Sequence, residues 1–117
     1  TMITRVAIIM GWAVVIIGSW VGGEMIAQLG HNVGVADGKE GLPLVNWSTK
    51  GGDLRVAHFF GLHGIQIIPL VGLWIQNKLG STSRNSLIVT IAFAILYAAL
   101  IGFTFYQAKQ GIPLFKM

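Results

Sequence analysis

The chain has 117 residues, of which 54% are hydrophobic and only 10% are charged. An ordinary soluble domain carries about 25% charged residues. A domain this short also leaves too much surface exposed to hide so many apolar side chains from water. The composition therefore excludes a typical soluble domain and indicates a protein that sits in lipid. The chain has no cysteine, which excludes disulfides and thiolate metal sites.

The formal net charge of +4 comes from eight Lys and Arg residues against four Asp and Glu residues. The basic residues lie between apolar segments instead of forming one stripe. This distribution suits anchoring at membrane surfaces, whereas a nucleic-acid groove needs a clustered basic patch. We therefore expect the lipid bilayer as a partner, and no nucleic acid.

Three apolar segments follow one another along the chain. They are "VAIIMGWAVVIIGSWVGG" (6–23), "VAHFFGLHGIQIIPLVGLWI" (56–75) and "SLIVTIAFAILYAALIGFTFY" (86–106). A helix that spans a bilayer needs about 20 mostly apolar residues, and all three segments meet or approach that length. The first segment exceeds the apolar core of a signal peptide, about 7–15 residues, and no small-residue cleavage site follows it.

The sequence thus predicts an all-α integral membrane protein with a single transmembrane domain over 1–117. Its three helices are expected at about 5–29, 54–77 and 85–108. The connection between the first two helices is rich in glycine and turn residues. Asp53, just before the second helix, is expected to cap it, and Arg55 to reach toward the headgroups.

Small and polar residues predict how the helices associate. In lipid, helices approach closely where small residues meet, so Gly18 and Gly22 indicate a contact face without naming its partner. Polar side chains turn away from lipid. We therefore expect a buried seam that joins the second and third helices, made of His63, Gln66, Tyr97 and Thr104.

The histidines raise the question of a cofactor. Glu24 and His31 share one helical face by their spacing of seven, and they lie on the same membrane side as His58. Carboxylate and imidazole groups suit Zn, Fe, Cu or Mn, and an imidazole can also hold a haem. Two main interpretations stay open for Glu24, His31 and His58, with His63 nearby: a structural polar cluster, or a metal or haem site. Proton transfer or quinone contact is a further alternative.

Residues 41–66, "GLPLVNWSTKGGDLRVAHFFGLHGIQ", resemble the signature of a family of uncharacterised bacterial multi-pass membrane proteins. That signature joins a G-L-P-x-V-x-W-S-T-x-G-G-D-L-R element to x-x-H-F-x-G-L-H. "GHNVG" (30–34) and "GIPL" (111–114) are similar to further elements of the family. The resemblance implies a bacterial inner-membrane location and no activity.

Two functions follow as expectations. Three helices enclose little volume, so the first is a non-enzymatic subunit or assembly component, as a homo-oligomer or docked on a larger membrane complex. The alternative is a haem- or metal-binding membrane redox protein that uses His58 with His31, Glu24 and His63. The cofactor would then be haem or a transition metal.

Overall fold

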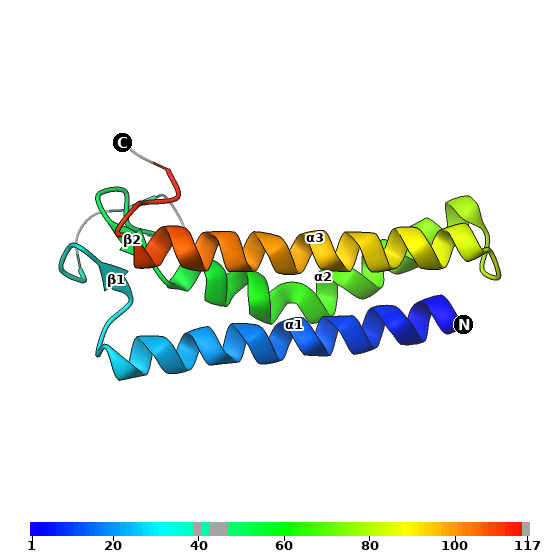
Figure 1. Cartoon of the computed structure of the whole chain (residues 1–117), viewed down its shortest axis with the longest axis horizontal. Helices are drawn as coiled ribbons and strands as arrows, with labels where there is room; N and C mark the ends of the chain where they lie inside the picture. Colours follow the sequence, from blue (N-terminus) through cyan, green and yellow to red (C-terminus); the bar gives the residue numbers. More distant parts are fainter. Residues whose placement is uncertain (39–40, 43–46, 116–117) are drawn as a thin grey trace.

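The computed structural model describes residues 1–38, 41–42 and 47–115, and three long helices dominate it (Figure 1). They are α1 (Met2–Ala27), α2 (Arg55–Leu79) and α3 (Arg84–Lys109). Each is long and apolar enough to cross a membrane. The prediction of an all-α, three-span membrane protein is confirmed, and every helix starts and ends within three residues of its expected bounds.

Each helix turns a row of mostly small or branched residues inward, spaced three or four apart. In α1 this row is Ala7, Gly11, Val14, Gly18 and Val21. The helices come closest where Gly18 meets Gly61, because a Cβ built on Gly18 would lie 2.7 Å from the Gly61 Cα atom. A Cβ on Gly22 would lie 2.9 Å from Cε1 of His58. The glycine face predicted from Gly18 and Gly22 is therefore occupied within the chain, by α2.

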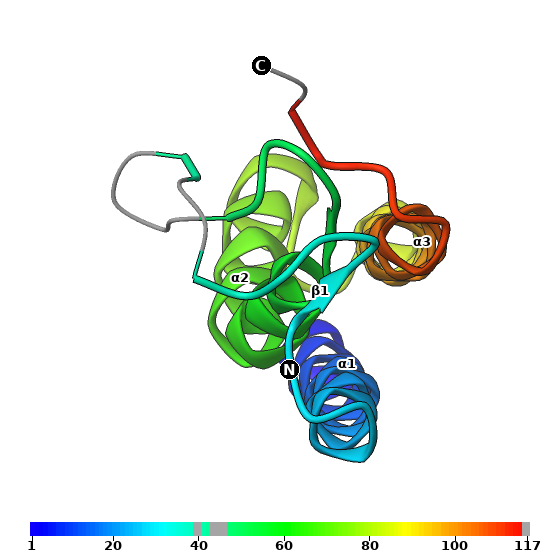
Figure 2. The ribbon, with the colours of Figure 1, turned by 90° about the vertical axis from the view of Figure 1, so that its left-hand side faces the viewer.

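Viewed along the helices, α2 lies beside both of its neighbours (Figure 2). The α1–α2 interface is the largest of the three, and the α1–α3 interface is the smallest. The helices pack as a bundle without a wide interior, so most large apolar side chains on their outer faces are left for lipid to cover.

A small antiparallel sheet closes one end of the bundle, which the sequence had not led us to expect. Strand β1 (Asn32–Val33) pairs with β2 (Gly52–Asp53), with Asn32 opposite Asp53. The backbone N–H of Leu54 donates to the carbonyl of His31 at 2.7 Å. This sheet draws the first connection back onto the start of α2, next to the end of α3 (Figure 1).

The opposite end of the bundle is simpler. A short turn joins α2 to α3, and α2 stops at Gly80, whose φ of 105° suits glycine. The chain begins beside this turn, where the Thr1 hydroxyl lies 2.9 Å from Oε1 of Gln76. The first connection and the residues after α3 share the other end, as three spans require (Figure 1).

A polar cap and a histidine groove

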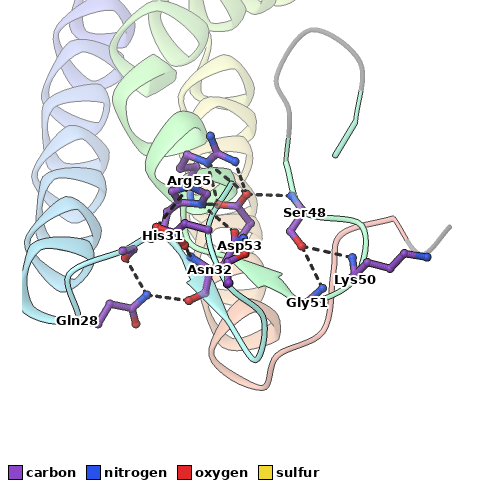
Figure 3. A network of polar contacts seen from close by, with 11 residues as sticks. Gln28, His31, Asn32, Ser48, Lys50, Gly51, Asp53 and Arg55 are labelled. Atoms are coloured by element: carbon purple, nitrogen blue, oxygen red, sulfur yellow. Dashed lines mark hydrogen bonds and ion pairs between the residues drawn. The ribbon is translucent and has the colours of Figure 1, made fainter. Parts of the chain in front are cut away.

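The sheet end carries a group of polar residues that we call the polar cap: His31, Asn32, Asp37, Ser48, Asp53 and Arg55. Figure 3 shows this group and labels all of them except Asp37. Its centre is Asp53, whose side chain is 1% exposed. The carboxylate accepts the backbone N–H of Ser48 at 3.0 Å and that of Arg55 at 3.0 Å. Nη2 of Arg55 completes an ion pair with it at 2.8 Å.

Arg55 therefore does not follow the expectation that it reaches toward the headgroups. Its guanidinium folds back onto Asp53, with Nε 3.1 Å from one carboxylate oxygen and 3.2 Å from the other. A buried carboxylate needs such a partner, because an unpaired charge away from water is costly. The N-cap of α2 is Leu54, which has no side-chain cap bond, so the expectation that Asp53 is the cap residue is wrong by one position. Asp53 still accepts the N–H of Arg55, the first residue of the helix.

His31 connects Asp53 to the first connection. Its Nδ1 lies 3.3 Å from Oδ1 of Asp53, and its Nε2 lies 3.7 Å from Oδ2 of Asp37. The Asp37 carboxylate also accepts the backbone N–H groups of His31 at 3.1 Å and Asn32 at 3.0 Å. Two carboxylates thus hold the turn that leads from α1 into β1.

The pKa of the Asp53 carboxyl shows whether burial or the hydrogen-bonding and charged partners have the stronger effect on it. Burial alone raises the pKa of its carboxyl, because it disfavours the charged form. The Arg55 side chain, the N–H groups of Ser48 and Arg55 and the positive charge of Arg55 together outweigh burial. The net pKa lies below the ordinary value of 3.8, so the cap favours the ionised form of Asp53.

Glycines allow the cap to close. A Cβ on Gly51 would lie 2.7 Å from the carbonyl oxygen of Val33, and one on Gly52 would overlap the backbone of Ala108. The Ser48 hydroxyl oxygen accepts the N–H of Gly51 at 3.1 Å. The W-S-T-x-G-G-D-L-R residues of this chain therefore build the cap.

His58 lies one turn beyond the cap and borders two hollows that share Arg55 and His58 as lining residues, and together we call them the His58 groove. The first is about 290 Å³ and is lined by Trp47, Arg55, His58, Phe59, Leu62 and His63. The second is about 580 Å³ and is lined by Arg55 and His58 together with Met25, Ile26, Leu29, Gly30 and His31. The groove opens on the side of the bundle, where its occupant would meet lipid or another chain.

The hydrogen bonds of His58 fix which of its nitrogens remains available. Its Nδ1 lies 2.7 Å from the carbonyl oxygen of Gly18. A carbonyl oxygen only accepts, so Nδ1 carries the proton and donates it. In the neutral ring the lone pair then belongs to Nε2, which makes no hydrogen bond within the described part of the chain. An imidazole oriented by a carbonyl in this way is the usual arrangement for a metal ligand.

The structure does not assemble the predicted cluster of Glu24, His31 and His58. Glu24 lies 3.9 Å from Nζ of Lys109 on α3, His31 belongs to the polar cap, and His58 bonds to α1. Over residues 1–38, 41–42 and 47–115, no group of three or more His, Cys, Asp or Glu side chains could hold a metal ion. The structure therefore does not bring these three side chains together at one site.

Two of the four residues of the predicted polar seam lie inside the bundle. Tyr97 is buried and its hydroxyl donates to the carbonyl of Phe60 at 2.5 Å, while buried Thr104 donates to Ile101 of its own helix at 3.0 Å. His63 and Gln66 lie on the outer side of α2 and pair with each other, Nδ1 to Oε1, at 2.6 Å. The expectation that they face α3 is wrong, because the glycine row of α2 takes that position.

Sequence reasoning assigned no role to Ser48, Asn32 or Asp37, which all belong to the cap. A usable signal was present, since two glycines directly before an aspartate indicate backbone packed too tightly for side chains.

Residues 43–46 of the family-like stretch lie outside the described residues. Comparison with protein-family models, curated proteins and solved structures finds no match to this chain.

Proposed function

We propose that the chain is a non-enzymatic subunit of a bacterial inner-membrane complex that presents His58 as a ligand to a bound haem-type ring. The observation that carries this proposal is the 2.7 Å bond from Nδ1 of His58 to the carbonyl of Gly18. It orients the imidazole, which lines the groove, and leaves the lone pair of the neutral ring on Nε2. The bacterial inner membrane rests on the resemblance of residues 41–66.

A haem-type ring fits the side chains better than a bare metal ion does. A bare ion needs three or more ligands from the protein, and the described residues provide no such group. A macrocycle brings its own nitrogen ligands and needs one axial imidazole. Trp47, Phe59 and Leu62 form an apolar wall beside His58, against which the flat face of a ring can lie.

The groove also supports the role of a subunit. It is open on one side, so a bound ring would be enclosed only by lipid or by a neighbouring chain. Arg55 cannot act as a lone cation there, since its guanidinium is paired with Asp53. This chain would therefore contribute one ligand and one wall of a shared site.

The test is an absorption spectrum with metal analysis on the full chain, purified in mild detergent from its native membrane. We expect a Soret band with near-stoichiometric iron, lost in His58→Ala and restored by added imidazole. Restoration shows that the variant folds and lacks only the ligand. His63→Ala, which removes the other imidazole of the groove, should keep the band.

A colourless preparation without iron would contradict the cofactor role. Stoichiometric Zn, Cu or Mn without a Soret band, lost in His58→Ala, would replace the haem-type ring by a transition-metal ion shared with another chain. A band that survives in His58→Ala would assign the ring to a different residue.

A further inference from the structure

A row of exposed side chains runs along the side of α2 that faces away from α1 and α3. We call it the outer stripe: Leu62, Gln66, Leu70 and Leu73, all exposed and spaced four, four and three residues apart. The opposite side of α2 is the buried row that contains Gly61, Gly64 and Ile68. Three of the four stripe residues suit lipid, and Gln66 does not.

Gln66 sits near the middle of a span of 25 residues, where an exposed amide meets hydrocarbon. Polar groups at this depth are costly unless they find partners, and they rarely face lipid. Its Oε1 accepts from Nδ1 of His63 at 2.6 Å, which satisfies one atom of each side chain. The amide N–H donors of Gln66 and the Nε2 acceptor of His63 make no hydrogen bond within the described residues.

These remaining groups are complementary to each other. Gln66 presents donors and His63 presents an acceptor on the same outer surface, three residues apart. A second copy of the same surface would therefore satisfy both, since a two-fold contact brings identical patches together. Two copies inserted in the same orientation would be related by an axis along the membrane normal, and their α2 helices would then run parallel.

We propose that the outer stripe of α2 binds a second copy of this chain, with Gln66 of each copy donating to His63 of the other. Three residues correspond to about 4.5 Å along a helix, which a glutamine side chain can reach across. Symmetry makes this bond twice. Leu62 and Leu70 then pack against their counterparts one turn to either side of Gln66.

The arrangement also sets the register. A single polar residue within an apolar helix contact fixes both register and number of copies, because any slip leaves the polar group unpaired. This proposal uses Nε2 of His63 and leaves His58 untouched. Leu62 and His63 also line the first hollow of the His58 groove, so the dimer contact would border the surface on which a ring is proposed to lie.

The experiment uses disulfide cross-linking of the full chain in lipid vesicles, since the natural sequence has no cysteine. Leu62→Cys and Leu70→Cys each place one thiol on the outer stripe beside an intact Gln66. Ile16→Cys on α1 is the matched control: Ile16 is 69% exposed against 64% for Leu70. In depth Ile16 matches Leu62, because neighbouring Gly18 meets Gly61.

Mild oxidation should convert both stripe variants to a covalent dimer at least about tenfold faster than the control. Adding Gln66→Leu to Leu70→Cys should lower the dimer yield at high lipid dilution by about tenfold. That factor corresponds to two interhelical hydrogen bonds of ordinary strength in a membrane. Equal rates for stripe and control would overturn the proposal.

Two further outcomes would also overturn the proposed dimer. If Gln66→Leu leaves the dimer yield unchanged, the hydrogen-bonded pair does not hold the copies together and the proposal fails. If the same cysteines in native membranes cross-link to a protein of different mass instead, that protein occupies the stripe and a second copy does not.

Discussion

Two neighbouring regions of the chain contain similar residue types and use them in opposite ways. In the polar cap, Asp53 and His31 have partners on both sides, from Arg55 and Ser48 to Asp37. Further along α2, His58 and His63 each use Nδ1 within the chain, and Nε2 of each makes no hydrogen bond within the described residues. The difference teaches that histidines close together in one chain can differ in unused hydrogen-bonding capacity, and that capacity is the basis of both proposals above.

The largest expected effect tests the structural half of this comparison. Asp53→Ala removes the centre of the cap and should lower the free energy of unfolding by about 3 kcal/mol, as loss of one partner of a buried ion pair does. Loss of helical circular dichroism during titration with SDS, in detergent micelles, measures it. Asp37→Ala removes an exposed carboxylate of the same connection and should lower the free energy of unfolding much less. Equal losses in the two variants would show that Asp53 is not the centre of the cap.

The second prediction concerns how α2 is oriented, and hence why His63 faces outward. Gly61→Ala puts a Cβ against the backbone of Gly18 and should destabilise the bundle by about 2 kcal/mol through overpacking. Gly102→Ala on α3 meets open space and should be neutral or slightly stabilising. The same SDS titration compares them. If the two variants behaved alike, the close approach of α1 and α2 would be wrong.

A smaller effect is expected where α3 bonds to α2. Tyr97→Phe removes the hydroxyl that donates to Phe60 and should cost about 1 kcal/mol, the usual value of one hydrogen bond. Tyr106→Phe, on an exposed tyrosine of the same helix, should change nothing. A neutral Tyr97→Phe would show that this bond adds no stability.

The smallest effect is the acid response of the cap. The pKa of Asp53 is below 3.8 in the folded chain, so its contribution is complete above the unfolded value and is lost as pH falls through the folded value. The free energy of unfolding should thus decline below about pH 4, and less steeply in Asp53→Asn. An equally steep decline in Asp53→Asn would assign the acid response to other carboxylates.

The sequence predicts the spans well because lipid imposes them. About 20 apolar residues are needed wherever a helix crosses, and no tertiary contact has to be known. The buried row of α2 can also be recognised in the sequence once the structure is known. Its residues Ala57, Gly61, Gly64, Ile68 and Gly72 recur at intervals of three or four. Small residues at that spacing decide which side of α2 turns inward.

The polar side chains could not be assigned by the same reasoning. His63 and Gln66 were expected inside because polar groups avoid lipid, yet close contact of glycines takes the inner face and leaves them outside. The grouping of Glu24, His31 and His58 depended on the path of the first connection. That path is set by Asp53 and the two-stranded sheet, which helical periodicity does not reveal.

The contact of Gly52 with Ala108 has a consequence for how the protein matures. Ala108 belongs to α3, which is translated after Gly52 and after α2. The β2 strand therefore meets this neighbour only once α3 has been made. Chains stalled after α2 lack the surface against which β2 rests.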